Sequence, residues 1–210
     1  MGGSVGTRAV RVVIAGAGIA GRAACEMALG LGAQVTMLDI NLKALARVQS
    51  QFGHRVNTIF STPASIARLT ATADLLIGAV LVPGAAAPKI ITRDIIKQME
   101  NGSVFVDISI DQGGCGETSR PTSLENPVFE EEGVLHYGVC NMPAQAPRTS
   151  TLALTAATLP YVLRLADQGM QAVKQDAALR GAVNTHEGFL TNKEVSDAVG
   201  VDWKPFEQVM

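Results

Sequence analysis

The chain has 210 residues, of which 47% are hydrophobic and 17% charged, and its formal net charge is −2. This composition is typical of a globular protein with a sizeable core, and it argues against disorder, nucleic-acid binding and attraction to anionic membranes. Three cysteines without a C-x-x-C pair predict neither a disulfide framework nor a metal site, and they favour a reducing, cytoplasmic compartment. We expect no membrane span, because the apolar runs are too short.

Short apolar runs and amphipathic stretches alternate through the first two thirds of the chain. Helical spacing of apolar residues predicts helices over 20–31 and 42–52, and Thr62 and Thr92 are expected to cap two further helices. The runs between them predict strands over residues 12–15, 34–38, 55–60, 74–82, 103–110 and 134–140. Strands separated by helices of this length imply right-handed crossovers. The predicted fold is therefore α/β, a doubly wound parallel sheet.

The character of the sequence changes after Cys140. A long helix is expected from about residue 148 to Gly169, interrupted or kinked at Pro160, followed by a helix over 170–181 and a short one before residue 200. We place the domain boundary between 1–147 and 148–210. Apolar side chains of the long helix need a partner surface and predict a homo-oligomer; they are Leu152, Leu154, Leu159, Val162 and Leu165.

A glycine motif follows the first predicted strand and opens the first predicted helix. Gly16, Gly18 and Gly21 fit G-x-G-x-x-G, in which the glycines allow a tight turn, close approach of a pyrophosphate and close helix packing. A dinucleotide phosphate would sit at the helix N-terminus. Asp39 ends the second strand, where its carboxylate can bind the adenosine ribose hydroxyls and repel a 2′-phosphate. These residues predict a Rossmann domain that prefers NAD to NADP, although such glycines can also serve only as a turn.

Further candidates follow the later strands. The loop GAVLVPGAAAPK suits a flat ligand ring, or is an ordinary small-residue loop. Asp111 can orient a substrate or stabilise positive charge, with an Asx-turn as the equal alternative, and Asn141 can hydrogen-bond a carboxamide or substrate. Met142 is either an adaptable apolar wall of the site or plain core.

Residues that would transfer protons are harder to find. His54 and Lys89 are expected to face water and His136 to be a core residue, while His186 is interpreted as structural. Cys115 lies beside glycines without a nearby base, which favours an unreactive loop thiol.

The sequence resembles the alanine dehydrogenases of the alanine dehydrogenase/transhydrogenase family in four stretches: GAGIAG…LGLGAQVTMLDIN, ADLLIGAVLVPGAAAPK, VDISIDQGGCGETSRPT and NMPAQAPRTSTLALTAATLPY. The resemblance runs from about residue 2 to about residue 201. It implies NAD-dependent oxidative deamination of L-alanine to pyruvate and ammonium. It also implies a Rossmann domain inserted into a substrate domain, to which residues from 148 onward would belong.

The resemblance also implies roles for individual residues. Asp111 matches the family's catalytic aspartate, and Asn141 would lie beside the substrate. The implied cofactor contacts are Gly16, Ala17, Gly18, Ile19, Ala20, Gly21, Asp39, Ser61, Val80, Leu81, Ile90, Ile108, Asp111, Asn141 and Met142.

One departure from the family pattern limits the expected activity. The family's substrate-binding arginine and lysine and its catalytic histidine lie in an N-terminal segment without a counterpart in this sequence. We therefore expect little turnover from this chain alone. The alternatives are the dinucleotide-binding subunit of a transhydrogenase and a stand-alone NAD-binding module.

Overall fold

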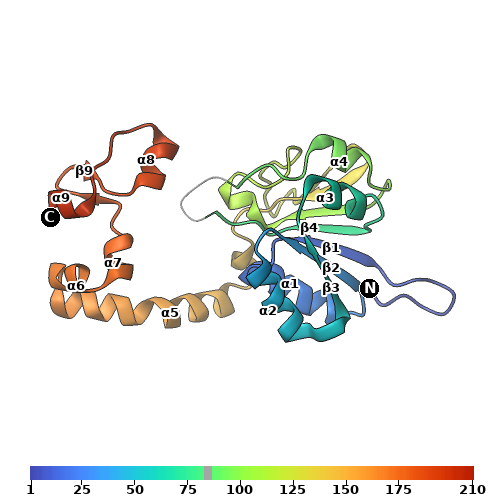
Figure 1. Cartoon of the computed structure of the whole chain (residues 1–210), viewed down its shortest axis with the longest axis horizontal. Coiled ribbons are helices and arrows are strands. Elements are labelled where there is room, and N and C mark those ends of the chain that lie inside the picture. Colours follow the sequence, from blue (N-terminus) through green and yellow to red (C-terminus); the bar gives the residue numbers. More distant parts are fainter. Residues whose placement is uncertain (83–86) are drawn as a thin grey trace. The chain divides into compact units, whose positions relative to one another are not determined.

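The computed structural model describes residues 1–82 and 87–210 (Figure 1). The chain forms two compact units, Met1–Asn141 and Met142–Met210. This division lies a few residues before the boundary expected between 147 and 148, because the 3-10 turn η3 (Met142–Gln145) packs against the helix that follows it.

The first unit is built on one seven-stranded sheet with the order β3-β2-β1-β4-β5-β7-β6. All neighbouring strands are parallel except β6 and β7, so the predicted doubly wound α/β fold is confirmed. The strands are β1 (Arg11–Ala15), β2 (Gln34–Asp39), β3 (Val56–Phe60), β4 (Leu75–Gly78), β5 (Val104–Asp107), β6 (Val128–Glu131) and β7 (Val134–Tyr137). The strand order reverses between β1 and β4, where the carboxyl ends of the strands leave room for a ligand.

Helices cover both faces of this sheet (Figure 1). They are α1 (Ile19–Gly30), α2 (Leu42–Phe52), α3 (Pro63–Thr70) and α4 (Arg93–Lys97), with 3-10 turns η1 (Gly53–Arg55) and η2 (Ile108–Gln112). On β1, Val12 and Ile14 join the apolar cluster under α1 and α2, whereas Val13 and Ala15 join the cluster under α3 and α4. Burial on both faces explains why these strands are uniformly apolar.

Helices α3 and α4 begin at the N-cap residues that the sequence predicts. Thr62 and Ser65 form a reciprocal capping box at α3, with Ser65 N donating to Thr62 Oγ1 at 3.1 Å and Thr62 N donating to Ser65 Oγ at 2.9 Å. Thr92 caps α4, where Ile95 N donates to its hydroxyl oxygen at 3.3 Å. Both predicted caps are confirmed.

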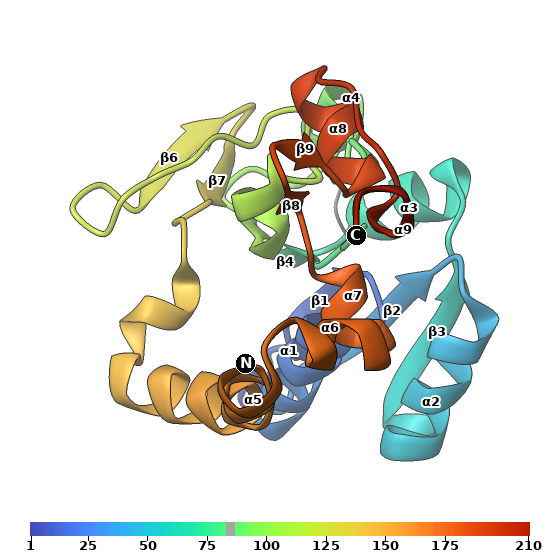
Figure 2. The ribbon, with the colours of Figure 1, turned by 90° about the vertical axis from the view of Figure 1, so that its left-hand side faces the viewer.

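Three predicted strands are shorter in the structure, and one strand of the first unit was not predicted. The strand expected over 74–82 ends at Gly78, the one over 103–110 at Asp107 and the one over 134–140 at Tyr137. The Asp107 carboxylate accepts a hydrogen bond from Ser109 N at 3.0 Å and so turns the chain into η2. The additional strand, β6, pairs with β7 as an antiparallel hairpin (Figure 2).

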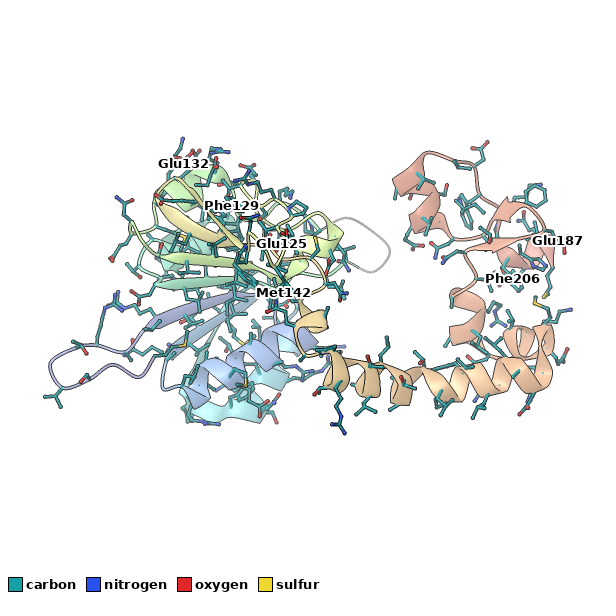
Figure 3. All side chains as sticks on the ribbon, turned by 180° about the vertical axis from the view of Figure 1, so that it is seen from behind. Glu125, Phe129, Glu132, Met142, Glu187 and Phe206 are labelled. Carbon is teal, nitrogen blue, oxygen red and sulfur yellow. The ribbon has the colours of Figure 1, made fainter. Side chains whose placement is uncertain are left out.

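The second unit is mainly helical, with α5 (Pro147–Gln168), α6 (Met170–Gln175), α7 (Ala177–Gly181), α8 (Lys193–Val199), α9 (Phe206–Val209) and the two-stranded sheet β8 (Thr185–His186) and β9 (Phe189–Leu190). Pro160 lies inside α5 without interrupting it. The single helix expected over 170–181 is wrong, because Asp176 is extended and caps α7 through Ala178 N at 2.8 Å. Phe206, labelled in Figure 3, packs edge-on against His186.

The apolar side chains expected on the long helix are exposed. Their exposed fractions range from 39% at Leu165 to 66% at Leu154. Among the described residues, no helix is both long and apolar enough to span a membrane.

Candidate functional site

The turn between β1 and α1 depends on two glycines that no other residue could replace without movement. Gly16 has φ +112°, and a side chain there would run into the backbone of Ala79. A side chain at Gly21 would overlap the carbonyl oxygen of Gly16. Gly18 differs, since a Cβ at this position would meet no atom of the described residues within 4 Å. The surface over Gly18 is therefore open.

The N-terminus of α1 has free hydrogen-bond donors at this turn. Its N-cap residue is Gly18, and within the described part of the chain no side chain caps this end and no acidic residue lies in the first turn. The first N–H groups of a helix have no intrahelical partners, and the helix dipole adds partial positive charge there. This end of α1 is suited to an anion.

Asp39 lies at the carboxyl end of β2 and is bound to the glycine turn. Its Oδ2 accepts a hydrogen bond from Ala17 N at 2.7 Å, and its Oδ1 accepts one from Asn41 N at 2.7 Å. Each carboxylate oxygen has further lone pairs, so the half-exposed side chain can still accept hydrogen bonds from a ligand. The sequence pattern did not indicate this link between the glycine turn and the acid.

A crevice of about 440 Å³ opens where β1, β2 and β4 end. It brings together eight of the predicted cofactor residues, namely Gly16, Gly18, Ile19, Asp39, Ser61, Val80, Leu81 and Ile90. Ala17 and Gly21 are buried behind this surface. The loop GAVLVPGAAAPK contributes Ala79–Val82 and Pro88 to the lining, and its residues 83–86 lie outside the described part of the chain.

A smaller crevice of about 150 Å³ adjoins the first and shares Ala79, Val80 and Leu81 with it. Its other lining residues are Ala20, Ile108, Ser109, Asp111 and Gln112. The predicted residues Ala20, Ile108 and Asp111 thus lie here and not in the larger crevice. Among the described residues that line the two crevices, only Asp39 and Asp111 have ionisable side chains.

Asp111 and Asn141 come together although 30 residues separate them. Asn141 N donates to Asp111 Oδ1 at 2.8 Å, and Asn141 has φ +51°, a left-handed conformation that asparagine tolerates. The Asx-turn weighed for Asp111 does not form among the described residues, because Gly113 N, the donor that such a turn needs, donates to Ile110 O at 3.0 Å. The local turn is formed by Asp107 instead. Met142 begins η3 in the second unit.

Asp107 anchors the loop that follows β5. This carboxylate is 2% exposed, and its Oδ2 accepts hydrogen bonds from Cys115 N at 2.8 Å, Gly116 N at 3.2 Å and Ser119 Oγ at 2.5 Å. Burial, and then the charge of Asp107, raise the pKa of the Cys115 thiol well above its usual range. Cys115 is therefore an unreactive structural thiol, as its sequence context favoured.

The predictions for the basic residues are partly confirmed. His136 is a core residue with Nε2 at 2.8 Å from Thr118 Oγ1, and it stacks on Phe129, labelled in Figure 3. Burial lowers the pKa of His136, so this imidazole is neutral at neutral pH. Lys89 does not simply face water: its Nζ donates to Gly113 O at 2.5 Å and Gly116 O at 3.0 Å. This lysine ties the segment before α4 to the loop after β5.

Known proteins are similar to this chain in both sequence and fold. Two curated relatives, alanine dehydrogenase 2 from Staphylococcus aureus strains USA300 and NCTC 8325, are each 49% identical over 212 residues, covering 100% of this chain and 57% of the relative. A solved L-alanine dehydrogenase has 47% identity and a TM-score of 0.85, covering 95% of this chain and 55% of that structure. The transhydrogenase from Sinorhizobium meliloti has 29% identity and a TM-score of 0.69, covering 91% of this chain and 52% of that structure.

These matches define how much of the relatives the chain represents. The chain spans somewhat more than half the length of the curated relatives it matches. The family model described as "Alanine dehydrogenase/PNT, C-terminal domain" matches residues 1–193. The chain therefore belongs to the alanine dehydrogenase/PNT C-terminal domain family.

Proposed function

We propose that the chain binds NAD across the two adjoining crevices and is the cofactor-binding part of an NAD-dependent alanine dehydrogenase. This enzyme would oxidatively deaminate L-alanine to pyruvate and ammonium. The observation that carries the proposal is the open backbone at Gly18 beside a carboxylate, Asp39, whose oxygens can still accept hydrogen bonds. The names of the relatives support the choice of reaction.

The residues of the larger crevice fit the adenosine diphosphate half of this cofactor. The uncapped N-terminus of α1 would hold the pyrophosphate over Gly18, where no side chain blocks its approach. Asp39 would accept hydrogen bonds from the ribose hydroxyls, Ser61 would lie on the adenine side, and Ile90 would contact the cofactor along its length. Ala17 and Gly21, buried behind the surface, would contribute through the backbone of the turn.

The residues of the smaller crevice fit the reacting half. Bound NAD would supply the hydride acceptor for alanine oxidation. Val80, Leu81 and Ile108 would exclude water with their apolar surfaces. The carboxylate of Asp111 would stabilise the positive charge that develops as the amine of alanine is oxidised, and Asn141 would orient the substrate.

The charge of Asp39 predicts the cofactor preference. A 2′-phosphate beside this carboxylate meets like-charge repulsion, so we expect NADH to bind at least about tenfold more tightly than NADPH. Replacing the acid by the isosteric amide, Asp39→Asn, should reduce this preference to about threefold or less, because the negative charge is gone. Calorimetric titration of both chains with both dinucleotides measures the change.

Equal affinities for NADH and NADPH in the native chain would contradict the assignment of Asp39. Asp74→Asn is a matched control, since Asp74 pairs with Arg8 at the amino ends of β1 and β4 and lines neither crevice. This variant should keep the native preference.

The chain by itself should oxidise L-alanine slowly. Among the described residues that line the crevices there is no basic side chain to hold the substrate carboxylate. A direct assay of alanine oxidation with NAD, by the chain or by a longer protein that includes it, separates the candidate functions. Turnover supports the dehydrogenase, and NADH binding without turnover in either form supports a stand-alone binding module.

The similarity to a transhydrogenase supports a second candidate function. A dinucleotide-binding subunit of that enzyme would bind NADH equally well but would pass the hydride to a second dinucleotide. Hydride transfer from NADH to an NADP analogue, without alanine oxidation, would favour it.

Self-association and a cytoplasmic location complete the proposal. The exposed apolar side chains of α5 favour a homo-oligomer, since such a helix face needs a partner surface. The unpaired thiols of Cys25, Cys115 and Cys140 favour a reducing compartment. A monomer in sedimentation experiments would argue against the oligomer.

A further inference from the structure

The segment Ala79–Leu81 is the wall that the two crevices share. β4 ends at Gly78, and Ala79 N still donates to Ala15 O of β1 at 2.8 Å. Val80 lies beyond the end of the strand. Its position therefore depends on contacts from another part of the chain.

Ser109 supplies these contacts with a single hydroxyl. Ser109 Oγ donates to Val80 O at 2.8 Å and accepts from Val80 N at 3.0 Å. Within the described residues these are the hydrogen bonds of the Val80 backbone. Ser109 thus satisfies both polar backbone groups of one residue that lies 29 positions earlier.

Ser109 is itself held in place by a buried carboxylate. Its N–H donates to Asp107 Oδ1 at 3.0 Å, and only 7% of the residue is exposed. The other oxygen of Asp107 accepts from Cys115 N, Gly116 N and Ser119 Oγ. A continuous set of hydrogen bonds therefore runs from the end of β5 through Ser109 to the wall between the crevices.

We propose that Ser109 is a positioning residue that fixes Val80 so that a dinucleotide can extend from the larger crevice into the smaller one. The inference rests on the proposed function, because it takes the bound dinucleotide to be NAD. Without the hydroxyl, the N–H and C=O of Val80 lose their partners and the shared wall is free to move. Gly18 and Asp39 lie outside this network, so the adenosine diphosphate half keeps its contacts with these two residues.

Ser109→Ala tests this role through the difference between two ligands. NADH reaches into the smaller crevice, whereas ADP occupies only the larger one. We expect the Kd of NADH to rise about three- to tenfold, as for the loss of one or two hydrogen bonds, and the Kd of ADP to change less than about twofold. Calorimetric titration of the full chain measures both constants.

Two further variants separate positioning from general structural damage. Ser119→Ala removes a hydrogen bond to the same Asp107 carboxylate without touching Val80, and it should leave the Kd of NADH unchanged. Ser109→Thr keeps the hydroxyl and should bind NADH within about threefold of the native chain.

Several outcomes would overturn the inference. Native NADH affinity in Ser109→Ala, an equal loss for NADH and ADP, or a loss in Ser109→Thr as large as in Ser109→Ala would each do so. If the native chain bound neither NADH nor ADP, the proposed function would fail and this inference with it. Native binding with an unaffected Ser109→Ala overturns the role of Ser109 alone.

Discussion

Gly18→Ala is expected to fold like the native chain and to bind NADH about ten- to a hundredfold more weakly, a loss of about 1.4–2.7 kcal/mol. The added methyl meets no protein atom of the described residues within 4 Å, and Gly18 has φ −72°, which alanine adopts readily. Alanine restricts the unfolded chain more than glycine does, which stabilises the folded variant, whereas glycine is the better N-cap residue. These two effects on the free energy of unfolding oppose each other. The methyl would instead occupy the space proposed for the pyrophosphate.

The measurement is a fluorescence titration with NADH together with a thermal melt. Gly30→Ala is the matched control, because Gly30 ends the same helix, has open space around a Cβ and lies away from both crevices. This control should keep the native Kd. Native affinity in Gly18→Ala would mean that no pyrophosphate passes over this turn.

Gly21→Ala gives a contrasting result at the same turn. Its Cβ would overlap the carbonyl oxygen of Gly16, an atom of the backbone that has little room to move. Loss of binding here would come with a lower melting temperature, so it would not identify a ligand contact. Of these two substitutions, Gly18→Ala is the one that tests binding without a change in folding.

The sheet of the first unit and the helices around it could be predicted because they depend on patterns within short stretches of sequence. A parallel strand that is buried on both faces is uniformly apolar, and helix caps act within three residues, as at Thr62. The strand ends were predicted less well, since apolar residues continue beyond the last sheet pairing. Val80 is apolar because it lines the crevices, and Ile110 because it is buried in η2.

β6 was missed for a different reason. Its sequence, VFEE, mixes apolar and acidic residues, as suits an edge strand with one exposed face. The turn to β7 consists of Glu132 and Gly133, both with positive φ. Hairpin turns of this kind usually carry Asn-Gly or Asp-Gly. Here Glu132 takes the place of Asn or Asp, although glutamate rarely adopts a positive φ, so the sequence does not indicate the hairpin.

The sequence predicts those residues of the candidate site that belong to one motif, but it does not predict contacts between residues far apart in the chain. Gly16, Gly18 and Asp39 follow from the spacing of one motif. The contact of Ser109 with Val80 spans 29 residues and that of Lys89 with Gly113 spans 24. No local pattern indicates such pairs, because they depend on how the ends of β4 and β5 are placed by the sheet.

Asp111→Asn is expected to lower kcat for L-alanine oxidation about 10²- to 10³-fold while leaving the Kd of NADH within about twofold. The amide oxygen can still accept the hydrogen bond from Asn141 N, so the connection between η2 and the end of the first unit is kept. What is lost is the negative charge that would stabilise the oxidised amine. Steady-state alanine oxidation, by the chain or by a longer protein that includes it, measures the effect.

The control for this substitution is Asp94→Asn. Asp94 lies in the first turn of α4, is exposed and lines neither crevice, so its loss of charge should leave kcat unchanged. A parallel loss of NADH binding in Asp111→Asn would assign Asp111 to the cofactor and not to the reaction. Native turnover would remove Asp111 from the mechanism, and the charge that balances the oxidised amine would then have to come from a residue other than the described ones that line the smaller crevice.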